Sequence, residues 1–282
     1  VDSANVSMVH DYEGKEFLIN LIDTPGHIDF GGNVTRAMRA IDGTIVLVCA
    51  SEGIMPQTET VVKQALRERV KPVLFINKVD RLINELKFTP EKMQQRFVEI
   101  VMEFNKLIEN IAEGEFKQKW KVNIADGSVA FGAARENWAL SVPYMKKKGV
   151  SFKQLLEMYS QDLTEKERQD WIWKHCPLNE VALDMVITHL PNPLEAQVYR
   201  IPKIWSGDPE SELGKDLMTC NRQGKLAFVV TRILMDAKSG REITAGRLYS
   251  GTIREGETVY LNMAKQHQRV GQVLMYQGIK PE

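Results

Sequence analysis

Two uninterrupted apolar runs limit the possible folds of this chain more than any other feature. Residues Gly43–Cys49 and Pro72–Ile76 contain no charged side chain and are rich in β-branched residues, which is typical of strands buried on both faces of a sheet. The segment between them, Pro56–Arg69, begins with proline and carries apolar residues at helical spacing. Because parallel strands need a crossover between them, this order predicts a parallel sheet with helices on both faces.

Further elements extend this pattern in both directions. Asn5–Val9 and Phe17–Ile22 are separated by a polar turn that contains glycine, which predicts a β-hairpin whose second strand is buried in the same sheet. A helix is predicted over Phe30–Ile41. A long amphipathic helix is predicted over Glu91–Ile111, where apolar residues recur at steps of three and four. Ser128–Phe131 predicts another strand of the sheet.

The character of the sequence changes towards the C-terminus. Two or three helices are predicted between residues 151 and 190, and Gln197–Arg222 is predicted to be an irregular connection between domains. From Lys225 onwards, short strands alternate with turns, as in a small antiparallel barrel. The predicted strands and one turn of this region are Leu226–Met235, Lys238–Gly240, Arg247–Ser250, Thr258–Leu261 and Val270–Tyr276.

Composition limits the class of protein. The 282 residues suffice for one large and one small domain, and 43% of them are hydrophobic. No apolar run approaches the roughly 20 residues that span a bilayer, so no membrane partner is expected. Acidic and basic residues balance at 37 each, so the chain lacks the basic footprint that would indicate DNA as a partner. Three cysteines without a CxxC spacing suit the reducing cytoplasm.

The motif Asn77–Asp80 directly follows the second apolar run, and ligands bind at the carboxyl ends of strands in open parallel sheets. The Asp80 carboxylate can accept two hydrogen bonds from the N1 and exocyclic amine of guanine, a pair of donors that adenine does not present. The Lys78 stem can lie along the ring, and the Asn77 amide can tie neighbouring loops to the base. Four such residues also occur by chance in solvated loops, but their place after a buried strand favours guanine binding.

A second motif, Asp23–His27, follows the second strand of the predicted hairpin. An aspartate at this place can hold Mg²⁺ through water, and the Gly26 amide can approach a phosphate because no side chain blocks it. His27 can position an attacking water. Alone, the motif also fits a simple strand-ending turn. Together with the motif at Asn77, it predicts a GTP site.

The run Asp23–Phe30 looks like the second switch region of the translational GTPases, and nearly the whole chain resembles that family. The similarity to the elongation factor 2 family of archaea is carried by Gly31–Ala40, Gly53–Thr60, Lys71–Lys87, Gly246–Ile253 and Gly256–Val259. This resemblance implies an α/β fold: an incomplete P-loop-type GTPase domain at residues 1–195, a connection at 196–221, and the start of a translation-factor β-barrel at 222–282.

The resemblance also implies roles for individual residues. Asp23 would hold Mg²⁺ through water, and His27 would be the catalytic residue. Ala133 stands where the family usually has Ser, so the loop loses a hydroxyl but keeps the Ala134 amide that would reach the guanine oxygen. The implied nucleotide-binding residues are Asp23, Thr24, Pro25, Gly26, His27, Asn77, Lys78, Asp80, Ala133 and Ala134. The implied ligands are GTP or GDP with Mg²⁺, and the implied partner is the ribosome with its RNA.

One motif that a GTPase needs is missing from the sequence. The phosphate-binding loop ends in Gly-Lys-Ser/Thr, whereas the Gly-Lys pairs at Gly14, Gly214 and Gly224 are followed by other residues. In the family this loop lies upstream, so we expect an internal fragment of a factor that hydrolyses GTP to move tRNA and mRNA through the ribosome. Such a fragment would bind nucleotide weakly and hydrolyse none. Two alternatives stay open: a module that docks to the ribosome or a partner, and another translational GTPase.

Overall fold

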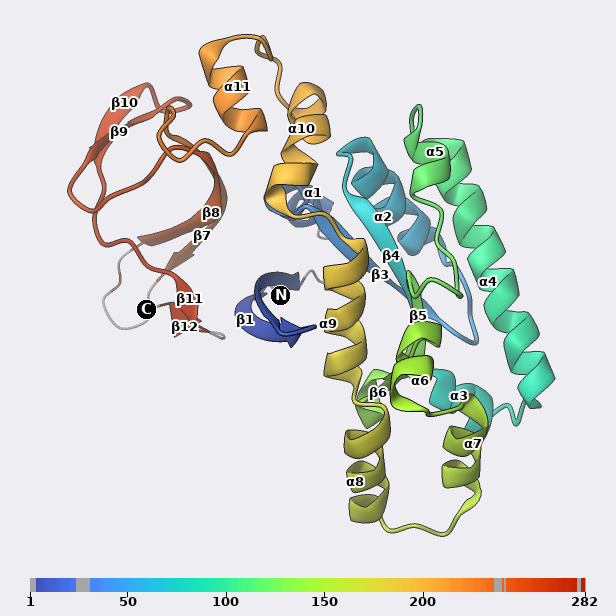
Figure 1. Cartoon of the computed structure of the whole chain (residues 1–282). Coiled ribbons are helices and arrows are strands. Elements are labelled where there is room, and N and C mark those ends of the chain that lie inside the picture. The colour runs from blue at the N-terminus through green and yellow to red at the C-terminus, as the bar shows by residue number, and fades with distance from the viewer. Residues whose placement is uncertain (1–3, 24–30, 236–239, 241, 278–279, 282) are drawn as a thin grey trace. The chain divides into compact units, whose positions relative to one another are not determined.

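The computed structural model describes residues 4–23, 31–235, 240, 242–277 and 280–281. The chain forms two compact units (Figure 1). The first, Gly43–Pro191, is called the sheet unit below, and the other combines Val1–Asp42 with Asn192–Glu282 and is called the second unit. In the described part of the chain, no helix has the length and apolar character needed to cross a membrane. The bounds 1–195, 196–221 and 222–282 stay a prediction.

The sheet unit is built on four strands in the order β3-β4-β5-β6. These are β3 (Gly43–Cys49), β4 (Lys71–Asn77), β5 (Val129–Ala133) and β6 (Trp138–Leu140). The first three strands are parallel, and β6 pairs antiparallel with β5. Both apolar runs therefore form neighbouring strands as predicted, and Pro72–Ile76 is buried throughout. The prediction that Gly43–Cys49 is buried on both faces is wrong: only Val46 and Val48 of β3 are buried, and the Leu47 side chain is 62% exposed. Strand β3 is the outer strand of the described sheet, so its apolar residues have a neighbouring strand on one side alone. The predicted fold class, a mostly parallel sheet with helices followed by antiparallel strands, is confirmed.

Helices lie on both faces of this sheet (Figure 1). The helices of the sheet unit are α2 (Pro56–Arg67), α3 (Val79–Asn84), α4 (Pro90–Ile111), α5 (Phe116–Lys119), α6 (Val142–Lys148), α7 (Phe152–Ser160), α8 (Glu165–His175) and α9 (Leu178–His189). Helices α2 and α4 pack against each other on one face, while α9 contacts β4, β5 and β6 from the other. The amphipathic pattern of α4 is confirmed, because Phe97, Ile100, Phe104 and others of its apolar stripe are buried.

In the second unit, the predicted hairpin is formed by β1 (Ala4–Tyr12) and β2 (Lys15–Asp23). The prediction that its second strand is buried in the parallel sheet is wrong. Among the described residues β2 pairs with β1 alone, and seven of its nine positions are exposed. Two neighbouring strands joined by the tight turn at Glu13 and Gly14 pair at little cost in chain entropy, and this pairing needs no third strand.

The described residues of the second unit also form three helices and three antiparallel strand pairs. They are α1 (Gly31–Ala40), α10 (Pro193–Ile204), α11 (Glu212–Met218), β7 (Ala227–Met235), β8 (Glu242–Ser250), β9 (Thr258–Leu261), β10 (Gln266–Arg269), β11 (Tyr276–Gln277) and β12 (Lys280–Pro281). Strand β7 pairs with β8, β9 with β10, and β11 with β12. The helix predicted around α1 and the antiparallel strands predicted around β7, β8 and β9 are confirmed.

Two predictions for this region are wrong. The segment Gln197–Arg222 is not irregular, because it contains most of α10 and all of α11. The sequence held the signal for α10: Asn192 caps the helix, Glu195 completes a capping box, and proline occupies the first turn. The prediction of a strand at Val270–Tyr276 is also wrong, because residues 270–275 lie in no strand and only Tyr276 belongs to one, β11. The strand that pairs with β9 is β10, which precedes this segment, and its side chains are all exposed, so apolar alternation could not reveal it. Residues 238 and 239 of the predicted turn lie outside the described residues.

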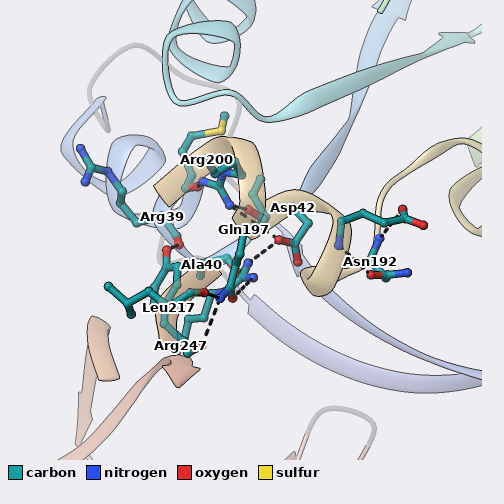
Figure 2. A network of polar contacts seen from close by, with 12 residues as sticks. Arg39, Ala40, Asp42, Asn192, Gln197, Arg200, Leu217 and Arg247 are labelled. Atoms are coloured by element: carbon teal, nitrogen blue, oxygen red, sulfur yellow. Dashed lines mark hydrogen bonds and ion pairs between the residues drawn. The ribbon is translucent and has the colours of Figure 1, made fainter. Parts of the chain in front are cut away.

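Buried arginines hold the C-terminal end of α1 (Figure 2). The last carbonyl groups of a helix have no partner within that helix. Arg200 of α10 donates hydrogen bonds to the carbonyl oxygens of Met38, at 2.7 Å, and Ile41. Arg247 of β8 donates to the carbonyl oxygen of Ala40 at 3.2 Å. Two guanidinium groups therefore satisfy these carbonyl oxygens and face the negative end of the helix dipole.

A carboxylate balances part of this positive charge. Asp42 Oδ1 lies 2.7 Å from Arg247 Nη1 and 3.8 Å from Arg200 Nη1. Gln197 Oε1 accepts from Arg247 Nη2 at 2.8 Å, and Gln197 Nε2 donates to the Tyr249 carbonyl oxygen at 3.1 Å. The Arg200 side chain is fully buried, and its bonds to carbonyl oxygens and its ion pair with Asp42 offset part of the cost of removing its charge from water.

Candidate functional site at the carboxyl edge of the sheet

The motif Asn77–Asp80 lies at the carboxyl end of β4 and at the start of α3. Lys78 adopts the left-handed conformation, with φ 61° and ψ 38°, and precedes the first residue of α3. This conformation is uncommon for residues other than glycine and costs of order 1–3 kcal/mol, so it indicates a constrained turn. Val79 is fully buried, while Lys78 is exposed and Asp80 is half-buried. The buried valine thus anchors the turn between two side chains that remain accessible to a ligand.

Asn77 links this turn to the loop after β5. Its side-chain oxygen Oδ1 accepts hydrogen bonds from the backbone amides of Lys78, at 2.8 Å, and Ala134, at 3.0 Å. Residues 57 positions apart in the sequence are thereby brought together at one edge of the sheet. The backbone N–H of Ala134, which was expected to donate to a guanine oxygen, donates to Asn77 Oδ1 in this structure. A base at this edge would have to share that amide or take it from Asn77.

The loop that carries Ala134 begins at the end of β5. Ala133 is fully buried and continues into the short 3₁₀ helix η2 (Ala134–Glu136), where Ala134 is exposed. Gly132 is required just before it, because a Cβ atom there would lie 2.3 Å from the carbonyl oxygen of Trp138 on β6. Close pairing of β5 and β6 therefore fixes where η2 starts.

The other predicted motif is described only at its first residue. Asp23 is the last residue of β2 and is exposed, and Thr24, Pro25, Gly26 and His27 lie outside the described residues. Over the described part of the chain, no group of three or more His, Cys, Asp or Glu side chains could hold a metal ion. The exposed carboxylate of Asp23 still fits Mg²⁺, which is commonly bound through one or two carboxylates together with phosphates and water.

Sequence reasoning did not identify three side chains beside this edge. Tyr159 of α7 donates a hydrogen bond to Glu136 Oε2 and accepts one from Trp138 Nε1 at 2.8 Å. Burial is the main cause that raises the pKa of Tyr159, followed by the hydrogen bond to Glu136 and its charge, and the charge of Asp80 adds to the effect. No motif or spacing in the sequence could have indicated this cluster, because only the fold brings α7 next to η2.

The chain is similar to known proteins over nearly its whole length. The family described as the elongation factor Tu GTP binding domain matches residues 1–192. A protein named elongation factor 2 from Methanopyrus kandleri is 60% identical over 278 residues, which cover 99% of this chain and 22% of that protein. Elongation factor 2 from Methanococcus vannielii is 60% identical over 276 residues, or 98% of this chain and 37% of that protein. Elongation factor 2 from Thermococcus kodakarensis is 59% identical over 278 residues, which cover 99% of this chain and 37% of that protein.

The chain therefore spans between 22% and 37% of the length of these relatives. The family match, by contrast, extends over more than half of the chain and includes the strand, turn and loop that carry Asn77, Asp80 and Ala134. The chain belongs to the family of the elongation factor Tu GTP binding domain.

Proposed function

We propose that this chain contributes the guanine-reading part of the GTP site in a ribosome-dependent elongation GTPase. The observation that carries the proposal is the Asn77 side chain, which joins the turn of Lys78 to the amide of Ala134 at the carboxyl edge of a parallel sheet. The relatives named elongation factor 2 support the translational role.

Each residue would act on a different part of the nucleotide. Asp80 would accept hydrogen bonds from N1 and the exocyclic amine of guanine, while the Lys78 stem would cover the ring. Ala134 would donate its amide to the guanine oxygen. Asp23 would hold Mg²⁺ through water, and the Gly26 amide would approach the γ-phosphate. Mg²⁺ would supply electrostatic stabilisation of charge on the phosphates.

Most of the affinity in such sites comes from charge-assisted bonds to phosphates and Mg²⁺. Because the sequence contains no Gly-Lys-Ser/Thr loop, the 282-residue chain by itself should bind GTP or GDP weakly and should not hydrolyse GTP. Activity belongs to a protein in which this segment is joined to that loop. Such a factor would couple hydrolysis to the movement of tRNA and mRNA through the ribosome.

The test is GTP turnover by a full-length protein that contains this segment, measured with and without ribosomes. We expect ribosomes to raise turnover by at least about tenfold, because a transition-state contact completed only on the ribosome adds directly to the rate. Sedimentation with ribosomes in the absence of nucleotide, without any stimulated turnover, would contradict the proposal and favour a docking module.

A further inference from the structure

The turn that carries the Ala134 amide has anchors besides Asn77. After η2 the chain passes through Asn137 in the left-handed conformation, with φ 61°, and the Leu178 amide donates to the Asn137 carbonyl oxygen at 2.9 Å. Between these points, the half-buried Glu136 side chain accepts the hydrogen bond of the Tyr159 hydroxyl. The turn is thus held at its first, third and fourth residues.

The Tyr159 hydroxyl is itself fixed in direction. Trp138 is fully buried and donates its indole N–H to the Tyr159 oxygen at 2.8 Å, so the hydroxyl proton is left to point at Glu136. The Tyr159 ring stands edge-on to Trp138, with centroids 6.3 Å apart, and Arg168 lies 5.7 Å from the ring centre on another side. The tyrosine therefore joins α7 and β6 to η2 through directional contacts.

We infer that Tyr159 is a positioning residue for guanine recognition, because through Glu136 it sets the direction of the Ala134 amide. This inference rests on the proposed function. The side chain of Ala133 does not support the turn through a hydrogen bond, because its buried methyl group can neither donate nor accept one. Productive contacts tolerate errors of only about half an ångström, so a loosened turn weakens the bond from Ala134 to the base.

The experiment uses Tyr159→Phe, which removes the hydroxyl and keeps the ring. Tyr144→Phe is a matched control, because Tyr144 is a buried tyrosine of the same unit whose hydroxyl likewise donates to a carboxylate, Glu180 Oε2 at 2.9 Å. Amide hydrogen exchange of residues 134–137 is measured first. GDP and the diphosphate of 2-aminopurine riboside, which has neither the oxygen at position 6 nor the proton on N1, are then titrated to millimolar concentration and followed by protein NMR.

We expect Tyr159→Phe to accelerate exchange at residues 134–137 and to weaken GDP binding about fivefold, the size of one lost hydrogen bond. Binding of the 2-aminopurine nucleotide should stay within twofold, because it has no oxygen for the Ala134 amide to meet. Tyr144→Phe should change neither quantity.

Three results would overturn the inference: unchanged exchange, faster exchange with unchanged GDP affinity, or equal losses for both nucleotides. The last result would mean a general destabilisation. If the unsubstituted chain showed no preference for GDP over ADP, this result would contradict the proposed function and therefore also the inference about Tyr159. The two outcomes can be told apart, because if only the inference about Tyr159 is wrong, the unsubstituted chain still prefers GDP over ADP.

Discussion

Replacing Arg200 with Met is expected to lower the free energy of unfolding of the second unit by about 3 kcal/mol, at the lower end of the range for breaking a buried charged network. The fully buried guanidinium donates to the carbonyl oxygens of Met38 and Ile41. Methionine fills much of the same space but donates nothing. Each carbonyl left without a donor costs about 1–3 kcal/mol, and loss of the ion pair to Asp42 adds to this cost.

Hydrogen exchange with mass spectrometry can locate the effect. Peptides that cover residues 31–42 should lose protection in Arg200→Met, whereas peptides from Gly43–Pro191 serve as an internal reference and should not change. Arg222→Met is the matched control, because Arg222 is exposed and a surface substitution of this kind usually changes stability by less than about 0.5 kcal/mol. Unchanged protection of residues 31–42 would show that the arginines do not hold the end of α1.

Exchanging His27 for Ala, in a full-length protein that joins this segment to a phosphate-binding loop, should reduce ribosome-stimulated GTP hydrolysis by at least about 100-fold. The proposed role is to position the attacking water, which matters in the transition state and not in the bound ground state. GTP affinity should therefore stay within about twofold, because an interaction made only in the transition state lowers turnover without weakening binding.

Single-turnover hydrolysis on ribosomes separates these quantities, with GTP affinity measured in parallel. His267→Ala is a suitable control, since His267 lies exposed on β10 in the same unit. Undiminished turnover in the His27 variant would remove the histidine from the proposed mechanism. A parallel loss of GTP affinity would place its role in binding.

The sequence was sufficient to predict most of the sheet unit. The run Pro72–Ile76 is apolar at every position and buried throughout, and the stripe along α4 repeats at a period that only a helix satisfies. The polar motif after β4 could be placed at the sheet edge for the same reason, since strand ends and ligand sites coincide in parallel sheets. Hydrophobic pattern and burial agree for β4 and α4, whereas in β3 the equally apolar run leaves Leu47 62% exposed.

For other elements, the hydrophobic pattern of the sequence did not determine which side chains are buried. The residues of β2 are apolar enough for a buried strand, but burial depends on a neighbouring strand that local pattern cannot supply. Strand β10 consists of Gln266–Arg269 and exists through its pairing with β9, so its side chains carry no signal. The Tyr159 cluster is similarly invisible, because its partners lie 21 and 23 positions away in the sequence. Contacts of this kind follow from packing and not from periodicity.

The most direct test of the central claim is to ask which base the edge at Asn77 recognises. Isotope-labelled chain is titrated with GDP, ADP and xanthosine diphosphate, and the amide signals of Lys78, Asp80 and Ala134 are followed by NMR. We expect weak binding, with dissociation constants of about a millimolar, and shifts of these signals with GDP but not with ADP. In Asp80→Asn the preference should pass to xanthosine diphosphate, since an amide can donate to the oxygen that replaces the guanine amine. Shifts that are equal for all three nucleotides, or that leave these three amides unaffected, would contradict the assignment of this edge as a guanine-reading site.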